Sequence, residues 1–315
     1  MSFMGAAYRR ALRRGDGSAI TQSMTTTIAL IGPGAIGGTL AAWLAQVPAN
    51  EVTVCARTPF TELVVDVPDG RTIEARPRVL VDPGAAVPVD WVITVTKTYD
   101  TAGAARWMER LLGPSTCVAV VQNGVEHMDR FADVLPRERT LPVIIDIPAE
   151  RSAPGRIRQR RQGDLTVPSG ELAARFIALF EGTPLTPRIS DDWVSVAWRK
   201  LALNSAGVVN ALTRKPAGVV RHPKAAALMR AIAAESMAVG RAMGARLSDT
   251  LPDEVLERLL ASAPDSVNSL LADRLADRPM ELDARNGVIV RLGALHGVPT
   301  PLNAMAVAIL EASIG

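Results

Sequence analysis

The sequence predicts an α/β domain with a doubly wound parallel sheet, followed by an all-α domain. From residue 27 to about 190, short apolar runs typical of strands alternate with amphipathic runs typical of helices. From Asp191 onward, one helical pattern follows another. A glycine-rich turn stands at the start of the alternating part, where a nucleotide-binding loop would be expected. These three observations give the fold class and place the domain boundary near Ile189–Asp192.

The glycine-rich turn has the spacing G-x-G-x-x-G. The apolar run Ile28–Ile31 leads directly into Gly32, Gly34 and Gly37, and an Ala-rich amphipathic segment follows. We expect Gly32 to allow the tight turn, Gly34 to let phosphates approach the backbone, and Gly37 to let the helix pack on the strand. Ala35 and Ile36 then begin a helix whose free N–H groups face the anion. The alternative is a plain tight turn, but strand, loop and helix stand in the order that a Rossmann-type domain needs.

The elements of the first domain, 27–190, follow in order. Apolar runs predict strands at Thr27–Ile31, Val52–Ala56, Trp91–Thr96, Cys117–Val121 and Pro142–Ile147. The helices between them are Ala35–Gln46, Thr101–Leu112 and roughly Val125–Ala132. Between 150 and 190 the Arg-, Gly- and Pro-rich sequence predicts short antiparallel strands and then a helix at Glu171–Phe180.

The second domain, 191–315, is predicted to be helical throughout. Its helices are expected at Trp193–Leu212, Pro223–Met243, Pro252–Ala261 with Thr250 as cap, Ser266–Leu275, Pro279–His296 and Pro301–Ile314. We expect the active site in the cleft between the two domains.

Residues 1–26 are predicted to lie outside the fold. The basic run Tyr8–Arg14 precedes a polar stretch, and neither has the apolar core of a targeting peptide. We expect a flexible tail, or a start of translation at Met24.

Composition narrows the class of protein. The 315 residues carry 48% hydrophobic and 21% charged side chains, as ordinary globular proteins do. A net charge of +3 does not favour nucleic-acid binding, and no run of about 18 apolar residues predicts a membrane span. Two cysteines, Cys55 and Cys117, exclude a disulfide framework and favour the cytoplasm. The cysteines and the three histidines lie far apart, without metal-ligand spacing, so we expect no metal.

The tip of the second predicted strand favours NADPH. An NAD site normally places a carboxylate there for the ribose hydroxyl, whereas this strand ends in Cys55-Ala56-Arg57-Thr58. The planar guanidinium of Arg57 suits a 2′-phosphate. The alternative is one surface arginine among many.

Two further strand ends carry polar residues. Lys97 follows the strand Trp91–Thr96, and Asn123 follows Cys117–Val121. The carboxyl ends of parallel strands meet at the ligand-binding edge, so we expect both side chains on the cofactor side. Asn123-Gly124 is alternatively no more than a turn.

Lys200 is the candidate proton donor. It lies four residues before Asn204, so both project from one helical face, among apolar neighbours. Desolvation lowers the pKa of such an ammonium, which can then protonate a carbonyl oxygen as hydride arrives at carbon. The alternative is an ordinary lysine at a domain junction. Lysine occurs only at Lys97, Lys200, Lys215 and Lys224, although arginine would supply a positive charge equally well.

Two residues nearer the C-terminus complete the candidate set. Glu281 is positioned to hold the lysine, or alternatively serves only the dipole of its helix. Ser269 is a candidate for binding a substrate carboxylate, or alternatively a helix cap.

Taken together, these pieces resemble the ketopantoate reductases (2-dehydropantoate 2-reductases). The matching segments are Gly32–Gly37, Thr96–Tyr99, Gln122–Gly124, Trp198–Leu201 with Asn204, Ser269–Asp273, and Glu281–Asp283 with Asn286-Gly287. The resemblance implies a Rossmann domain, a helical domain and NADPH-dependent reduction of 2-dehydropantoate to pantoate, in pantothenate biosynthesis. It further implies that Lys200 is the general acid and Glu281 positions it. Asn204, Ser269 and Asn123 would contact the 2-keto acid, while Lys97, Asn123 and Arg57 would contact NADPH.

One departure concerns the substrate. The family commonly has a second Asn four residues after the first, and Val208 stands there, next to Gly207, which is expected to kink the helix. The alternatives are therefore a reductase of the same build acting on another 2-keto acid or an imine, and a dinucleotide-sensing module without turnover. The apolar faces of the last three helices allow a homodimer surface or are simply core.

Overall fold

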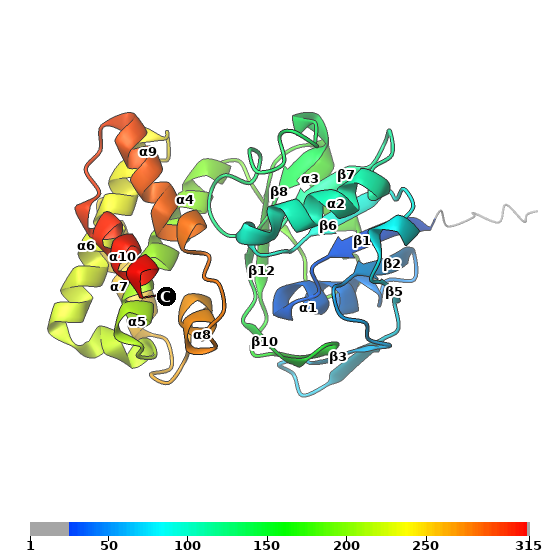
Figure 1. Ribbon diagram of the computed structural model, residues 1–315, viewed down its shortest axis with the longest axis horizontal. Coiled ribbons are helices and arrows are strands. Elements are labelled where there is room, and N and C mark those ends of the chain that lie inside the picture. The colour runs from blue at the N-terminus through cyan, green and yellow to red at the C-terminus, as the bar shows by residue number, and fades with distance from the viewer. Residues whose placement is uncertain (1–24, 314–315) are drawn as a thin grey trace, which may run out of the picture.

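The computed structural model describes residues 25–313. The predicted tail, 1–26, lies almost wholly outside the described residues. Figure 1 shows two halves side by side, with the strands gathered in one and the later helices in the other. This confirms the predicted fold class.

The first half is built on a parallel sheet of six strands in the order β5-β2-β1-β6-β7-β8. Its strands are β1 (Thr26–Ile31), β2 (Asn50–Cys55), β5 (Arg78–Leu80), β6 (Trp91–Thr94), β7 (Cys117–Val120) and β8 (Thr140–Pro142). Helices α1 (Ala35–Leu44) and α3 (Glu171–Ala178) cover one face, and α2 (Thr101–Leu111) covers the other. Both faces of the sheet are therefore buried, as a doubly wound sheet requires.

Two smaller sheets complete this half. One has the order β10-β11-β3-β4, from β3 (Leu63–Asp66), β4 (Thr72–Ala75), β10 (Ala149–Ala153) and β11 (Arg156–Gln159). It packs on α1 so closely that a Cβ at Gly38 would lie 2.1 Å from Ile157 Cδ1. The other has the order β13-β12-β9, from β9 (Ile144–Asp146), β12 (Asp164–Pro168) and β13 (Arg188–Ser190). Short 3-10 turns lie at Pro83–Ala85, Thr98–Asp100 and Arg137–Arg139.

The second half consists of helices around their own apolar core. They are α4 (Trp193–Ala206), α5 (Val208–Thr213), α6 (Pro223–Ala242), α7 (Leu251–Leu260), α8 (Ser269–Leu275), α9 (Val288–His296) and α10 (Pro301–Ala312). A 3-10 turn at Ala217–Arg221 precedes α6, and a π-helix at Asp283–Gly287 precedes α9.

Several sequence expectations were wrong in detail. The strand expected at Pro142–Ile147 is two strands in different sheets: Pro142 lacks a backbone N–H and ends β8, and β9 pairs with β12 instead. The helix expected at Val125–Ala132 is a series of turns. Strands β3, β4 and β5, between 57 and 90, were not predicted.

The helical half departs from expectation at four points. The helix expected at Trp193–Leu212 breaks at Gly207, whose carbonyl accepts a hydrogen bond of 2.9 Å from Asn268 Nδ2. Asn268, rather than Ser269, caps α8 by accepting from Leu271 N at 2.9 Å. Thr250 precedes α7, but its hydroxyl contacts Glu254 at 2.6 Å and caps no backbone N–H. The helix expected at Pro279–His296 begins later and passes through the π-helix.

Candidate functional site

The glycine-rich turn has the geometry of a phosphate-binding loop. Gly32 has φ +89°, which favours glycine, and a Cβ at Gly37 would lie 2.2 Å from the Gly32 carbonyl oxygen. A Cβ at Gly34 would meet no heavy atom within 4 Å, so this position faces open space. No side chain caps α1 and its first turn has no acidic residue, which leaves its N–H groups for an anion. These residues fit a dinucleotide pyrophosphate.

Arg57 lies just beyond the end of β2, at the same edge of the sheet. Its side chain is 87% exposed, and Nη1 lies 4.0 Å from Asp100 Oδ2. The pairing is long and exposed, so the guanidinium is available to a phosphate on the adenosine ribose.

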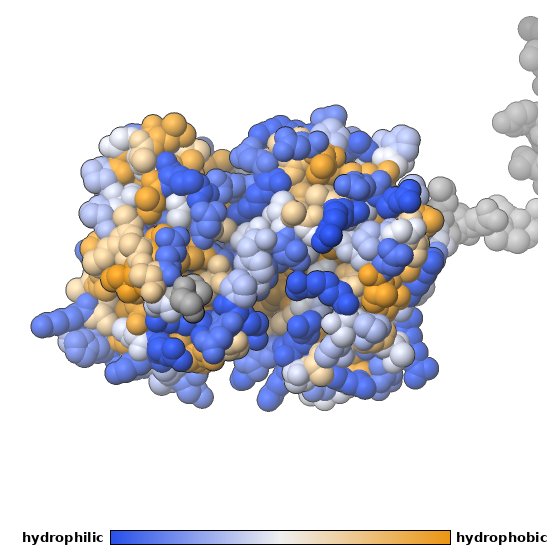
Figure 2. Space-filling view, viewed as in Figure 1, coloured by the Kyte–Doolittle hydropathy of each residue, from blue (hydrophilic) through white to orange (hydrophobic). Residues whose placement is uncertain are grey.

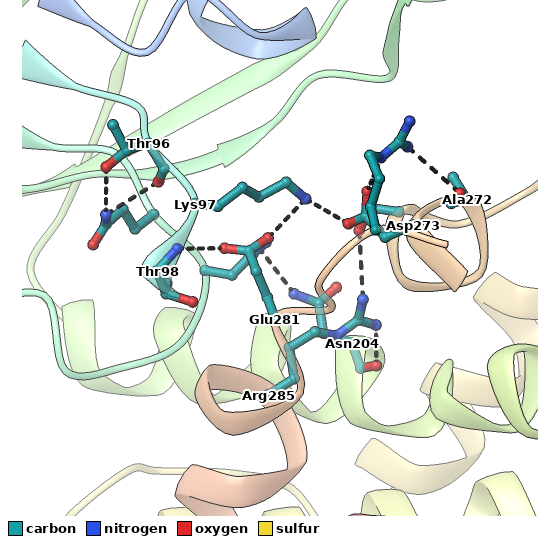
Figure 3. Close-up of polar contacts among 12 residues, drawn as sticks. Thr96, Lys97, Thr98, Asn204, Ala272, Asp273, Glu281 and Arg285 are labelled. Carbon is teal, nitrogen blue, oxygen red and sulfur yellow. Dashed lines mark hydrogen bonds and ion pairs between the residues drawn. The ribbon is translucent and has the colours of Figure 1, made fainter. Parts of the chain in front are cut away.

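Lys97 reaches from the sheet to the helical half. Its Nζ lies 2.8 Å from Asp273 Oδ2 and 3.0 Å from Glu281 Oε2. Figure 3 shows this ammonium between the two carboxylates. Burial lowers the pKa of Lys97, but the charges of Glu281 and Asp273 outweigh that effect and raise it. Lys97 is therefore a fixed cation that joins the two halves.

Glu281 accepts hydrogen bonds from three groups of the first half. Besides Lys97, it accepts from Thr98 N at 3.1 Å and from Asn123 Nδ2 at 3.0 Å. Burial raises the pKa of this carboxyl, but the Lys97 charge and the three donors more than offset it and lower the pKa. Glu281 is thus an ionised anchor for Lys97 and Asn123.

Asn123 extends this chain of contacts to α4. Its Oδ1 lies 3.5 Å from Asn204 Nδ2, a long contact at the limit for a hydrogen bond. The expected cofactor-side residue Asn123 and the expected substrate residue Asn204 therefore face each other across the boundary between the halves.

Lys200 lies one turn before Asn204 on α4, and its Nζ donates to the Ile145 carbonyl oxygen. Burial lowers the pKa of Lys200 to about 8, against the attraction of Asp146, and the positive charge of Arg285 adds to the lowering. A cavity of about 310 Å³ opens beside Lys200 and Asn204. An ammonium with this pKa, in a cavity, is suited to proton transfer near neutral pH.

The expected contact between Glu281 and Lys200 is absent from the described residues. Glu281 holds Lys97 instead, and a neutral carbonyl, that of Ile145, holds Lys200. The reason is topological: β9 brings Ile145 against α4, whereas Glu281 faces the end of β6.

Ser269 is exposed at the first position of α8, and its Oγ lies 3.4 Å from Arg285 Nη1. Arg285, Asp273 and Asp146 are site residues that the sequence analysis did not single out. Asp273 stands four residues after Ser269, a helical spacing that signals a shared face. Arg285 stands three residues after Leu282 and three before Val288, so helical spacing places it on an apolar face. A charged residue on such a face is the sequence signal that could have identified it.

Two negative findings apply to residues 25–313. No group of His, Cys, Asp and Glu side chains there could hold a metal ion. None of the helices in that range is long and apolar enough to cross a membrane.

The chain matches two protein-family models along most of its length. The model for ketopantoate reductase PanE/ApbA matches residues 28–171, and the model for the C-terminal part of the same family matches residues 192–313. A 2-dehydropantoate 2-reductase of Caulobacter vibrioides is 57% identical over 91% of this chain and 99% of its own length.

Solved structures share the fold. A 2-dehydropantoate 2-reductase of Geobacter metallireducens has a TM-score of 0.85 at 23% identity, covering 91% of this chain and 99% of its own. A D-mandelate dehydrogenase, solved with NADH and anilino(oxo)acetate, has a TM-score of 0.83 at 20% identity, covering 91% and 98%.

Proposed function

Because the chain belongs to the ketopantoate reductase family, we propose that it reduces 2-dehydropantoate to pantoate with Lys200 as the proton donor. The enzyme is an NADPH-dependent oxidoreductase, and its product places it in pantothenate biosynthesis. The observation that carries the assignment of Lys200 is its environment: a partly buried ammonium with a pKa of about 8, beside a cavity and next to Asn204.

NADPH, when bound, supplies the hydride that reduces the keto carbon. Gly32, Gly34 and Gly37, with the N–H groups of Ala35 and Ile36, would hold its pyrophosphate, and Arg57 would hold its 2′-phosphate. Lys97 and Asn123 would contact the cofactor, and the hydrogen bonds of both to Glu281 support this role by fixing their side chains.

The protein's own part in the reaction is to deliver one proton and to stabilise one developing charge. As the keto oxygen gains negative charge, the ammonium of Lys200 stabilises it and donates the proton that completes the hydroxyl group. Asn204 and Ser269 hold the substrate, with Asn123 opposite Asn204. Glu281 acts by fixing Lys97 and Asn123, and the Ile145 carbonyl orients Lys200.

The test is an NADPH-oxidation assay with 2-dehydropantoate beside a panel of other 2-keto acids and an imine. We expect 2-dehydropantoate to have the highest kcat/KM. Faster turnover of another acid or of the imine would reassign the substrate within the same reaction class. Tight NADPH binding without oxidation against any member of the panel would favour a dinucleotide sensor. The panel is needed because Val208 stands where the family commonly has an Asn that helps to hold the substrate.

Three further properties belong to the proposal. The chain divides near residue 190 into 27–190 and 191–315, since β13 ends at Ser190 and α4 begins at Trp193. It works in the cytoplasm, consistent with two free, buried cysteines. It forms a homodimer through α9 and α10, where Leu295, Met305 and Ile309 are exposed and Figure 2 shows apolar patches on the helical half. Sedimentation of the purified chain tests the dimer.

A further inference from the structure

Arg285 is a buried cation between α4 and α8. It is 3% exposed and lies in the π-helix Asp283–Gly287, where Val288 N bonds to the Asp283 carbonyl. π-Helical turns are rare and occur frequently at functional sites. This turn places the guanidinium against α4 and α8 rather than toward solvent (Figure 3).

The donors of Arg285 are largely unused. A guanidinium has five N–H donors. One at Nη2 donates to the Asn204 carbonyl oxygen, and one at Nη1 reaches Ser269 Oγ at the long distance of 3.4 Å. Nε is buried without any partner. An arginine of this kind retains capacity to bind an acceptor with two oxygens.

The positive charge of Arg285 is also uncompensated. Among the described residues, Arg285 forms no ion pair, whereas the nearest acids are occupied by other cations. Asp273 pairs with Lys97 and with Arg278 at 3.0 Å, and Glu281 pairs with Lys97. Burial lowers the pKa of Arg285 to about 10, against the attraction of Glu281 and Asp273, so it remains charged at neutral pH. A buried charge without a partner is costly, and an anionic ligand would remove that cost.

Arg285 contacts the two residues that are proposed to hold the 2-keto acid: Asn204 through its backbone carbonyl and Ser269 through its hydroxyl group. A Cβ at Gly207 would lie 3.3 Å from Arg285 Nη2, so the glycine that breaks the helix also leaves room for the guanidinium. Val208, at the position where the family commonly has Asn, is fully buried and offers no polar group.

We propose that Arg285 binds the carboxylate of the 2-keto acid and selects carboxylate substrates over neutral carbonyl compounds. The inference rests on the proposed function and names the group that recognises the acid in this chain. The fork of the guanidinium matches the two carboxylate oxygens, and Ser269 Oγ at its edge supplies a further donor. Arg285 thereby provides the polar contact that Val208 does not.

A purely structural role predicts a different result. The Asn204 carbonyl is near the C-terminal end of α4, and arginine side chains often satisfy such carbonyls. Arg274 has that role elsewhere, because its Nη1 donates to the Ala211 carbonyl near the end of α5. Arg274→Met is therefore the matched control for loss of a carbonyl-binding arginine.

The experiment compares two substrates on the full chain: 2-dehydropantoate and its neutral lactone, formed between its own carboxyl and hydroxyl groups. NADPH oxidation is measured for wild type, Arg285→Met, Arg285→Lys and Arg274→Met. We expect Arg285→Met to lower kcat/KM for the acid about 100-fold, chiefly through KM. Its value for the lactone should change by a factor of about three or less. Arg285→Lys retains the charge without the fork and should lose about 10-fold on the acid.

The acid-to-lactone ratio decides the outcome. Arg274→Met should leave this ratio at the wild-type value while lowering the melting temperature. Equal losses on acid and lactone in Arg285→Met would overturn the proposal in favour of the structural role. If Arg285→Met does not fold, an unchanged ratio in Arg285→Lys would overturn it as well. If wild type reduces a different 2-keto acid, the proposed substrate fails, and the ratio is measured on that acid and its amide.

Discussion

Two lysines reach from one half of the molecule to the other, in opposite directions, and their partners differ in charge. Lys97, at the end of β6, lies between two carboxylates, and its pKa is raised in spite of burial. Lys200, on α4, donates to a neutral carbonyl, and burial lowers its pKa to about 8. Burial is the largest single influence on both groups. The comparison teaches that the acids in contact decide whether a buried lysine is a permanent charge or a proton donor.

Removing the proton donor should have the largest effect. Lys200→Ala is expected to lower kcat about 1000-fold, because the variant lacks the ammonium that is proposed to protonate the keto oxygen. NADPH affinity, measured by fluorescence titration, should stay nearly unchanged. Turnover at the wild-type rate in this variant would contradict the role of Lys200.

Exchanging each lysine for arginine should separate the two roles. Lys97→Arg retains a fixed cation between Asp273 and Glu281, so we expect a loss of about 10-fold or less in kcat/KM. Lys200→Arg should lose about 100-fold or more, because a guanidinium is a poor proton donor near neutral pH. Steady-state kinetics of the two variants at pH 7 provide the measurement. Similar losses in both variants would contradict the assignment of Lys97 as a fixed cation and of Lys200 as the proton donor.

The pH profile should follow the pKa of Lys200. Reduction requires the protonated form, so kcat/KM should be high below about pH 8 and fall above it. Asp146 opposes the lowering of that pKa, so Asp146→Asn should move the descending limb to lower pH by about half a unit, a roughly twofold loss at pH 8.

Asp164→Asn is the control for this shift. Asp164 lies on neighbouring β12, lines the same cavity and pairs with Arg188 at 3.0 Å. The charges that shift the pKa of Lys200 are those of other residues. Its profile should coincide with wild type. An unshifted descending limb in Asp146→Asn would show that Asp146 does not influence the pKa of Lys200.

The smallest expected effect concerns stability, and its sign differs between the two lysines. Lys200 has a pKa of about 8 in the folded chain against an ordinary 10.5, so the unfolded chain binds more protons between these values. Burying charged Lys200 therefore costs stability below pH 8, and this cost disappears toward pH 10.5. We expect Lys200→Met to raise the melting temperature at pH 7 by about 3 °C, and by less at pH 10. Lys97→Met should lower it, because the Lys97 pKa is raised and two carboxylates lose their partner. Melting curves that shift in the same direction would contradict the comparison.

Residues whose positions follow from strand ends and helical spacing could be predicted. Gly32 comes directly after β1 and Lys97 three residues after the end of β6, so parallel topology alone brings them to one edge. Lys200 and Asn204 share a helical face by their spacing alone. The positions of these residues follow from local sequence pattern because the fold leaves the strand ends and the helical faces where that pattern predicts them.

The partners of those residues could not be predicted from pattern. Ile145 meets Lys200 through a backbone carbonyl, which carries no residue-type signal, and only because β9 leaves the main sheet. Glu281 contacts Lys97 rather than Lys200, and sequence spacing does not say which of the two lysines is nearer. The pattern of Val125–Ala132 predicts a helix, yet the buried His127 ring packs against Trp193 at 6.0 Å between ring centroids and the segment forms a run of turns. Tertiary contacts decided each of these outcomes.

The π-helix before α9 contains one residue more than a regular helix would need. A π-turn has one residue more than an α-turn, so deleting a single residue from Asp283–Gly287 would restore a regular helix. The helix after the deletion would keep nearly the same orientation, because the shorter α-turn closes over about the same angle. The fully buried Val288 and Ile289 would therefore stay in the helical core, whereas Arg285 would lose the position that the wider turn gives it. A one-residue deletion within the π-turn is expected to preserve folding and to impair substrate binding, whereas the same deletion within α9 should disrupt the core.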